Sequence, residues 1–432
     1  MRPRIHYFHS STAIGLLLAA AVLAACNGDT TVTVNSSPGI PSGNSSPSNT
    51  PPPAVVQAQK SGTTVNPAIA TADNAFGLNL FQTLITGSTG NVAISPINVA
   101  MALQILYNGA AGTTQQAMAQ TLQLGALSTQ DLNNANAALQ ASLLNPDPEV
   151  EVIIANSLWM HLDNNPVVAS FAQTDQTFYG ATVGDLSGAP ANVNAWASAA
   201  TNGLITDILP NANYAVVVAV IANTIYFKGQ WTTPFDPSQT VTAGFNLVDG
   251  SAVPSQMMHQ SGSYAYLQGA NFQAVSLPYG QGRFSMLIVL PNSGVSLSSF
   301  AAGITPGDVS GWVGQLQMTQ GSIALPKFTS TYGASLSPAL STLGMGIALC
   351  SSNMADFSAL APSVCVSDVE HKTVVEVDET GTVAAAGTTI TVGPTAIVAP
   401  MFTMTMDHPF LYAIRDDLSG ELLFIGILMN PI

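Results

Sequence analysis

The residues of this chain that could carry out chemistry do not form a recognisable catalytic or metal-binding motif. The six His residues are scattered without the spacing of a metal site, and the three Cys include no CxxC pair. The sequence also lacks the HExxH, GxSxG and Walker A patterns of zinc proteases, serine hydrolases and nucleotide-binding enzymes. A Ser-His-Asp triad stays open because its members can converge from distant positions, yet no motif supports one. We therefore expect no catalytic residue, no metal and no cofactor.

The most unusual stretch of the chain is ETGTVAAAGTTITVGP, which runs from Glu379 to Pro394. It holds too much Gly and Thr for a stable helix and is too apolar for an ordinary loop. No charged residue occurs from Gly381 to Met406, so the stretch could be buried without leaving an unpaired charge. Its role has to be sought in the elements around it.

Length and composition indicate a folded protein with a large core. Of its 432 residues, 47% are hydrophobic and only 7% are charged, which is enough for one large domain or two ordinary ones. The chain has 23 Asp and Glu residues against 8 Lys and Arg residues. This acidic balance makes nucleic acid an unexpected partner, since the phosphate backbone attracts basic surfaces.

The N-terminus predicts export from the cytoplasm. Residues 1–25 combine a basic start with an apolar run from Ala13 to Ala25, which is short for a membrane span but typical of a signal peptide. The end of this run and Cys26 resemble the lipobox of bacterial lipoproteins. That resemblance implies cleavage before Cys26 and lipidation of its thiol, hence a periplasmic or cell-surface protein anchored to a bacterial membrane. The alternative is an ordinary signal peptide with a Cys at its junction.

After Cys26 the composition changes twice. Residues 26–65 are rich in Pro, Ser and Thr and cannot bury enough apolar surface to fold, so we predict a lipidated Cys followed by a flexible tether. Residues 66–432 form the predicted folded domain. The two remaining cysteines, Cys350 and Cys365, are compatible either with a disulfide in an oxidising compartment or with two small buried thiols.

Hydrophobic periodicity predicts an α+β fold for this body. Phe76, Leu80 and Leu84 recur at helical spacing, and a second amphipathic helix begins after Ser95-Pro96. Short apolar runs typical of strands dominate after residue 215. They occupy residues 216–226, 283–290, 374–377, 401–406, 410–414 and 422–429, and the last two are joined by a turn-rich break that predicts a hairpin.

A series of short motifs runs through the body in a fixed order, and together they resemble the serpin family of serine protease inhibitors from about Asn66 to Pro431. Each motif alone is weak, whereas the ordered set is very specific. The motifs are NVAISPINVAMALQILYNGAAGTT (91–114), ANSLWMH (155–161), VNAWASAATNGLITDILP (193–210), ANTIYFKGQWTTPFDP (222–237), SLPYG (276–280), SMLIVLPN (285–292), IALPKF (323–328), ADFSAL (355–360), VSDVEHK (366–372) and DHPFLYAIRDDLSGELLFIGILMNP (407–431).

This resemblance implies the serpin fold, with three β-sheets, eight or nine helices and an exposed reactive-centre loop. The large central sheet of that fold can open and accept one more strand. The strand that ends at Val377 would lead directly into the unusual stretch, which matches the hinge and reactive loop of the family. The matching hinge residues are Glu379, Gly381, Thr382, Ala384, Ala385, Ala386 and Gly387.

The composition of this hinge suits insertion into a sheet. With the two-residue period of a strand, one face contains only small or apolar side chains, and Pro394 is the first residue that would remove a ladder donor. Thr380 and Val383 stand where the family commonly has acidic residues, and both changes keep the hinge small or apolar. The residues of the inward face are Thr382, Ala384, Ala386, Thr388 and Ile390.

The resemblance also places the bond that a target protease would cleave. The family spacing, counted from Gly381, puts this bond between Thr395 and Ala396. The surrounding residues from Val392 to Val398 are small or β-branched. Such residues fit the shallow apolar pocket of elastase-like or subtilisin-like proteases and not the acidic pocket of trypsin-like enzymes.

Four further positions match structural sites of the family. Ser95, Asn223 and His371 match the shutter, where polar side chains hydrogen-bond across the seam along which the sheet opens. Trp231 matches the breach at the top of that seam. Asn98 occupies a position where the family usually has a second shutter Ser, so its hydrogen bonding should differ.

Taken with the resemblance, these features predict a protease inhibitor rather than an enzyme. The expected mechanism is suicide-substrate trapping, in which loop cleavage is followed by insertion into the central sheet. The expected partners are a target serine protease, or a cysteine protease, and a membrane contacted through the N-terminal lipid; we expect a monomer. The alternative is a non-inhibitory serpin that acts as a binding or structural module, and the small, uncharged residues Ala384 to Gly387 favour the inhibitor.

Overall fold

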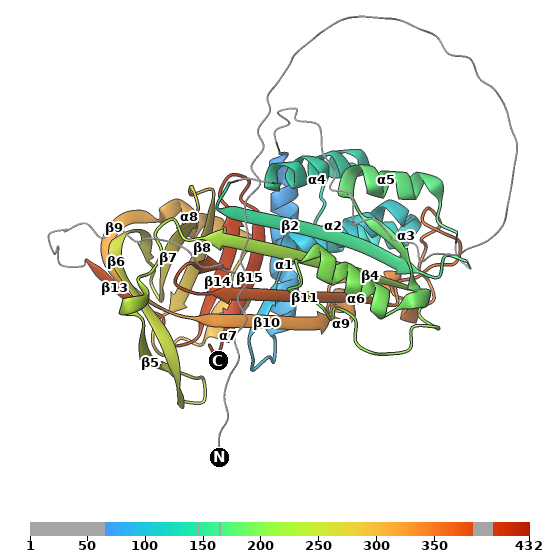
Figure 1. Cartoon of the computed structure of the whole chain (residues 1–432). Helices are drawn as coiled ribbons and strands as arrows, with labels where there is room; N and C mark the ends of the chain where they lie inside the picture. Colours follow the sequence, from blue (N-terminus) through green and yellow to red (C-terminus); the bar gives the residue numbers. More distant parts are fainter. Residues whose placement is uncertain (1–64, 145–146, 164–165, 383–400) are drawn as a thin grey trace, which may run out of the picture. The chain divides into compact units, whose positions relative to one another are not determined.

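A computed structural model describes residues 65–144, 147–163, 166–382 and 401–432. The described residues contain nine α-helices and two β-sheets. Figure 1 shows them coloured along the sequence. No helix in these ranges is long and apolar enough to cross a membrane. The predicted α+β class is confirmed.

The central sheet has six strands, and it contains the start of the predicted hinge as its shortest member. Long strands lie side by side along its length (Figure 1). The order across the sheet is β10 (Phe328–Ser335), β11 (Asp368–Val377), β12 (Gly381–Thr382), β4 (Ala219–Gln230), β2 (Val150–Met160) and β3 (Thr182–Asp185).

The second sheet has nine strands and combines two of the three sheets expected from the resemblance. Both halves meet in β6 (Ala252–Gln268), whose 17 residues are long enough to pair with β7 near one end and with β9 and β5 along the rest. The other strands are β1 (Val92–Ile94), β15 (Leu422–Leu428), β14 (Phe410–Asp416), β8 (Phe284–Pro291), β7 (Phe272–Tyr279), β9 (Gln317–Pro326), β13 (Phe402–Thr405) and β5 (Val241–Asn246).

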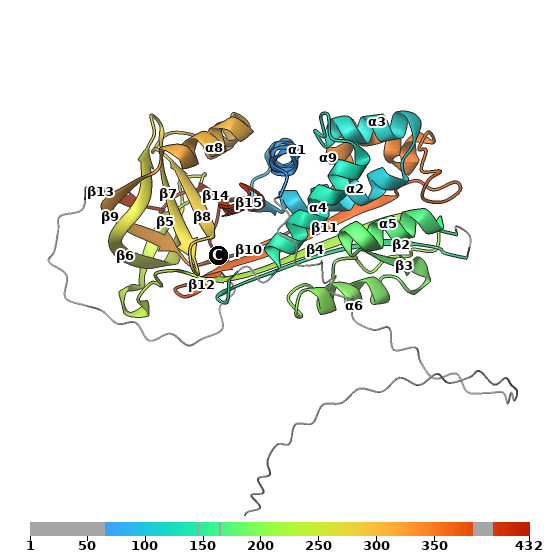
Figure 2. The ribbon, with the colours of Figure 1, turned by 90° about the horizontal axis from the view of Figure 1, so that it is seen from above.

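Helices cover both faces of the central sheet. Figure 2 shows α2, α4 and α5 on one face and α6 on the other, where Trp159 and Trp196 belong to a separate small core. The main core lies on the first face and continues under the second sheet. The helices are α1 (Pro67–Ile85), α2 (Pro96–Gly109), α3 (Gly112–Thr121), α4 (Thr129–Leu143), α5 (Ala169–Tyr179), α6 (Ala191–Ala200), α7 (Leu297–Ala302), α8 (Pro306–Gln315) and α9 (Ser337–Thr342).

Most of the periodicity predictions are confirmed. Both expected helices form as α1 and α2, and Asn66 and Ser95 cap them by accepting backbone N–H groups. The predicted hairpin is β14 paired with β15. The strand expected from Val216 is wrong at its start, because β4 begins at Ala219 and then runs on to Gln230. The periodicity missed β2, which does not alternate along its length because its second half, from Asn156 to Met160, is buried on both faces.

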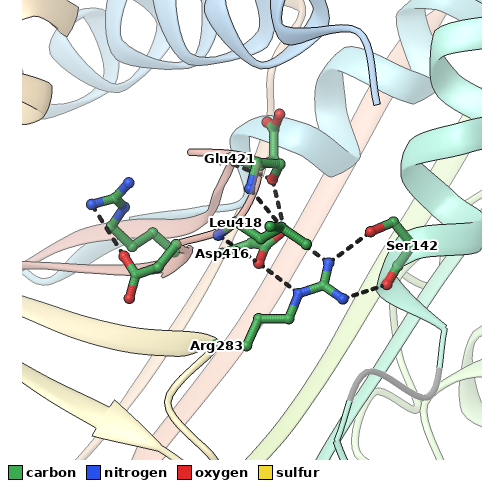
Figure 3. Close-up of polar contacts among 8 residues, drawn as sticks. Ser142, Arg283, Asp416, Leu418 and Glu421 are labelled. Carbon is green, nitrogen blue, oxygen red and sulfur yellow. Dashed lines mark hydrogen bonds and ion pairs between the residues drawn. The ribbon is translucent and has the colours of Figure 1, made fainter. Parts of the chain in front are cut away.

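A buried ion pair fastens the end of α4 to the second sheet (Figure 3). The Arg283 guanidinium donates to both carboxylate oxygens of Asp416 at 2.8 and 2.9 Å, and also to the backbone oxygen and hydroxyl of Ser142, both at 2.8 Å. Asp416 has no exposed side-chain surface. Burial acts to raise the pKa of Asp416, but the hydrogen bonds from Arg283 and Ser419 outweigh it and hold this pKa below its usual range.

The two cysteines of the folded body are joined. A disulfide connects Cys350, in a short 3₁₀ helix, with Cys365, just before β11. Of the two alternatives that the sequence left open, the structure therefore contains the bridge. It closes a loop with a sequence separation of 15 residues, which in the chain-entropy model stabilises the fold by about 3 kcal/mol.

Candidate functional site

The first residues of the hinge already lie inside the central sheet. Thr382 in β12 pairs with Val377 of β11 on one side and with Gly229 of β4 on the other, and Gly381 pairs with Gln230. Farther down the sheet, β11 pairs directly with β4 from Asp368 to His371. The seam between β11 and β4 is therefore closed at one end and separated by β12 at the other.

Gly381 is the residue that lets the chain approach β4 so closely. A Cβ atom at this position would lie 2.0 Å from the backbone oxygen of Gly229 and 2.8 Å from the Cα of Gln230. Real Cβ atoms do not approach backbone atoms to such distances, so any other residue would push the two strands apart. The hinge glycine is thus required by packing at the point where it enters the sheet.

Thr382 provides the first side chain of the inserted segment. It is 2% exposed, and its hydroxyl lies 2.6 Å from that of Tyr279, which has no exposed surface. The Tyr279 ring stacks on Trp231 with 4.4 Å between ring centroids. The predicted inward orientation of Thr382 thus agrees with its burial, and the hydroxyl pair satisfies two polar groups that would otherwise be desolvated.

Trp231, the predicted breach residue, holds the backbone just before the hinge. Its indole Nε1 donates to the backbone oxygen of Asp378 at 2.9 Å, and its backbone N–H donates to that of Thr380, also at 2.9 Å. The Asp378 carboxylate accepts the backbone N–H groups of Thr380 and Gly381 at 2.8 and 3.2 Å. These contacts fix the turn between β11 and β12 at the top of the seam.

Glu379 ties the same turn to the second sheet. Its carboxylate accepts from the Lys327 ammonium at 2.7 Å and from the Thr240 hydroxyl at 2.8 Å. Burial acts to raise the pKa of Glu379, but hydrogen bonds, first among them that from Lys327, outweigh it and keep this pKa below its usual range. The acidic side chain of the hinge therefore stays ionised outside the seam, while the residues after it are uncharged.

The three predicted shutter residues meet in the closed part of the seam. The Ser95 backbone N–H donates to His371 Nε2 at 3.2 Å, so Nδ1 carries the proton and donates to Asn223 Oδ1 at 3.1 Å. The Asn223 amide in turn donates to the backbone oxygen of Asn98 at 3.0 Å. Burial lowers the pKa of His371 to about 3, which agrees with a neutral ring that uses both nitrogens.

Asn98 behaves differently from a shutter Ser. Within the described part of the chain, neither atom of its side-chain amide has a hydrogen-bond partner, although the side chain is fully buried. It contributes to the shutter only through its backbone, whose oxygen accepts from Asn223 and whose N–H donates to the Ser95 hydroxyl at 3.4 Å. The extra length of Asn relative to Ser therefore adds a desolvation cost at the seam without an added hydrogen bond.

The remaining predicted site residues lie outside the described residues. These residues are Cys26, the hinge positions Ala384, Ala385, Ala386 and Gly387, and the expected cleavage site Thr395 and Ala396.

Three residues of the site were not singled out from the sequence. Tyr279 lies in the SLPYG motif and Lys327 in the IALPKF motif, so the resemblance had marked both segments without giving their contacts. Thr240 follows the ANTIYFKGQWTTPFDP motif and had no signal of its own. A spacing pattern shows neither the cross-sheet hydroxyl pair of Tyr279 with Thr382 nor the ion pair of Lys327 with Glu379, because the partners are far apart in the chain.

Comparisons with known proteins agree with this architecture. The family model described as Serpin (serine protease inhibitor) matches residues 71–431. The chain is 33% identical over 376 residues to Serpin-ZX of Hordeum vulgare, and the aligned region covers 80% of this chain and 92% of Serpin-ZX. The native-state structure of tengpin, a thermophilic serpin, matches with a TM-score of 0.79 at 26% identity, covering 86% of this chain and 96% of tengpin. The structure of human thyroxine-binding globulin in complex with its ligand matches with a TM-score of 0.76 at 27% identity. The match covers 84% of this chain and 99% of the globulin.

Proposed function

The chain belongs to the serpin family, whose members are generally serine protease inhibitors, and we propose that it traps a serine protease by loop cleavage and insertion. The observation that carries this proposal is the position of β12. Gly381 and Thr382 already occupy the space between β11 and β4, and the residues that follow carry no charge up to Met406. The same strand can therefore lengthen along the seam without burying a charge.

In the proposed reaction, the Ser hydroxyl of the target protease attacks the carbonyl carbon of Thr395. The bond to the nitrogen of Ala396 breaks, the amine takes a proton from the base of the protease, and Thr395 stays bound as an ester of the protease Ser. Cleavage frees the chain before Thr395 to extend β12 between β11 and β4. The thirteen residue steps from Thr382 to Thr395 span about 40 Å at about 3.3 Å per residue, so the acyl-enzyme is carried along the sheet.

Insertion is driven by the sheet itself. Each added residue completes backbone hydrogen bonds with strands on both sides, and the alternating small side chains bury apolar surface. The seam must open where β11 now pairs directly with β4, beside His371 and Asn223. The shutter hydrogen bonds therefore set part of the barrier that insertion has to overcome.

The proposed targets are elastase-like or subtilisin-like serine proteases. This specificity rests on the small and β-branched residues from Val392 to Val398, which fit a shallow apolar pocket. If Thr395 entered the acidic pocket of a trypsin-like protease, the carboxylate of that pocket would be buried without a positive partner.

The test is covalent complex formation on a denaturing gel. The full chain is incubated with elastase, subtilisin and trypsin, and we expect a stable complex with either of the first two and none with trypsin. The released C-terminal peptide should begin at Ala396. Complete cleavage without a complex would overturn the trapping mechanism, and a different first residue would overturn the specificity alone.

Two variants at Thr382 link this complex to insertion. Thr382→Arg would bring a charge into the seam beside Tyr279, so hydrolysis should outrun insertion and the chain should become a substrate. Thr382→Ser keeps the hydroxyl and should still form the complex. Equal complex formation by the Arg variant and the natural chain would show that insertion past this residue does not limit trapping.

The alternative is a non-inhibitory serpin that acts as a binding module. The likeness to thyroxine-binding globulin, whose structure contains thyroxine, illustrates that this fold can hold a ligand. The uncharged hinge residues from Gly381 onward favour the inhibitor, because a binding module has no need of an insertable loop. Loop cleavage without a complex and without a change in stability would support the alternative.

We also propose that the chain is exported and held at a bacterial membrane through lipid on Cys26. The basic start, the apolar run and the small residues before Cys26 support this proposal. Because several acyl chains together give a stable anchor, Cys26→Ser should move the protein from the membrane fraction to the soluble fraction. Retention of the Ser variant on membranes would require another anchor.

A further inference from the structure

Two exposed methionines lie on one face of the second sheet, at its edge. Met318 in β9 is 70% exposed, and Met401, the residue just before β13, is 79% exposed. The Met401 backbone N–H donates to the backbone oxygen of Gln320 at 2.8 Å, and from Phe402 paired with Gly321 the two strands run parallel. Because side chains alternate along a strand, Met318 and Gln320 share a face of β9, and Met401 lies beside them on that face.

The strands that form this face contain no fully charged residue type. β6, β9 and β13 lie side by side at one end of the second sheet (Figure 1). None of these three strands contains an Asp, Glu, Lys or Arg residue. The exposed side chains of Met318, Gln320, Met401 and Thr403 are called the methionine face below. Methionines are over-represented at binding surfaces, because their flexible, polarizable side chains adapt to the shape of a partner.

The backbone under the methionine face is fixed by packing on the opposite, buried side. Phe402 stacks on Tyr266 with 3.7 Å between ring centroids. Gly321 leaves room for this ring, since a Cβ at that position would lie 2.1 Å from Cε1 of Phe402. The backbone at Met401 is therefore held in place before a partner binds, which lowers the ordering cost of binding.

The length of the chain limits how far this face can be from the bond proposed to be cleaved. Five residue steps join Ala396 to Met401, and they span at most about 18 Å at about 3.6 Å per step. A serine protease of about 220 residues has a radius of gyration of about 17 Å. A protease that attacks Thr395 therefore brings the surface beside its cleft within reach of the methionine face. Since Met401 follows the cleaved bond, this surface lies on the leaving-group side of the cleft.

We propose that the methionine face is a second docking surface for the target protease, in addition to the loop. The partner that it fits is a serine protease with an uncharged, apolar surface next to the leaving-group side of its cleft. Burial of Met318 and Met401 would stabilise the encounter complex with such a protease. A charged protease surface would lose hydration against this face without gaining a counter-ion. The inference rests on the proposed trapping function and adds that the body of the chain takes part in selecting the protease.

Met318 gives the sharpest test, because it lies in β9 and cannot enter the protease cleft together with the loop. The full chain is mixed with elastase and, separately, with subtilisin, and the second-order rate constant of each reaction is measured. We expect Met318→Glu to lower the rate constant at least about tenfold for the protease that docks on the face, because a carboxylate would be desolvated there. Met318→Leu keeps the apolar surface and should keep the rate constant within about twofold.

Met354→Glu is the matched control for the added charge. Met354 is 65% exposed and lies in the loop that the Cys350–Cys365 disulfide closes, before β11 begins. The methionine face lies toward the other end of β11, where Phe328, just after β9, pairs with Val377. This variant should react at the rate of the natural chain. Neither Glu variant should change the ratio of complex to cleaved chain, because insertion after acylation sets that ratio.

Three results would overturn the docking surface while leaving the trapping mechanism intact. They are an unchanged rate constant in Met318→Glu, a similar fall in Met354→Glu, and an equal fall with both proteases. Elastase and subtilisin carry the same catalytic residues on unrelated folds, so an equal fall would mean that the face positions the loop. Cleavage of the natural chain without a complex would instead overturn trapping, and the same comparison of cleavage rates would still decide whether the face docks a protease.

Discussion

At the scale of the residue, the hinge combines one position that has no room for a side chain with one whose side chain must be uncharged. Gly381 leaves no room for a Cβ beside Gly229, and Thr382 places an uncharged hydroxyl against Tyr279. The acidic residue of the turn, Glu379, points instead to Lys327. Charge is thus kept to one side of the point where the chain enters the sheet.

Gly381→Ala should release the hinge from the sheet. The added methyl group would lie 2.0 Å from the Gly229 oxygen, so β12 cannot keep its place between β11 and β4. We expect faster hydrogen exchange at the amides of residues 381 and 382 and slower trapping of a protease. Gly314→Ala is the control, because its Cβ meets no atom within 4 Å and exchange at the hinge should not change. Unchanged exchange in Gly381→Ala would contradict the packing described.

Buried acids give the stability an unusual pH dependence. Burial raises the pKa of Asp73 from 3.8 to about 8, although Gln104 donates a hydrogen bond to it. Between these values the folded chain holds a proton that the unfolded chain has released, so this group stabilises the fold fully below about pH 4 and loses its effect as pH rises through 8. Burial shifts Asp175 and Glu421 in the same direction, whereas the lowered pKa of His371 acts oppositely below about pH 6.5.

Asp73→Asn should therefore flatten the fall of stability between pH 5 and 8. The slope of the unfolding free energy should become shallower by up to about 1.4 kcal/mol per pH unit, the value for one proton. Urea unfolding at several pH values measures it. Asp249→Asn is the control, since hydrogen bonds from Ser251 keep the pKa of this exposed group low and it does not titrate in this range. An unchanged slope in Asp73→Asn would show that Asp73 is ionised in the fold.

At the scale of the element, the seam between β11 and β4 is held differently at its two ends. At one end the shutter residues hydrogen-bond across it, and at the other β12 separates the strands under Trp231. The end of α4 is tied to the second sheet by the Arg283 cluster, in which the Asp416 side chain is fully buried. The sheet can thus open along one seam while the elements around it stay fixed.

Arg283→Met tests how α4 is fastened. The change would leave the Asp416 carboxylate buried without its cation, and the expected loss is about 3–5 kcal/mol in the free energy of unfolding. Lys372→Met is the matched control, because it breaks an ion pair with Asp207, whose side chain is 71% exposed, and should cost less than about 1 kcal/mol. Similar losses in the two variants, measured by urea unfolding, would mean that burial of the pair does not matter.

At the scale of the whole molecule, the sequence alone predicted the class of fold and much of the site. The ordered motifs assigned Trp231 to the breach and Ser95, Asn223 and His371 to the shutter. In the structure Trp231 contacts the turn before the hinge, and the three shutter residues meet in one cluster. Periodicity could not find β2, whose second half is buried on both faces, nor the joining of two sheets through β6. Periodicity also could not predict contacts such as the hydroxyl pair of Tyr279 and Thr382, because these depend on side-chain geometry between distant segments.

The central claim is that the loop inserts into the central sheet once it is cut, and thermal unfolding before and after cleavage tests it most directly. Insertion should add about ten backbone hydrogen bonds at about 1 kcal/mol each, which corresponds to a rise in the unfolding temperature on the order of 10 °C. We predict this rise for the natural chain cut between Thr395 and Ala396, and a smaller one for Thr382→Arg cut at the same bond. An unfolding temperature that cleavage leaves unchanged in the natural chain would contradict insertion.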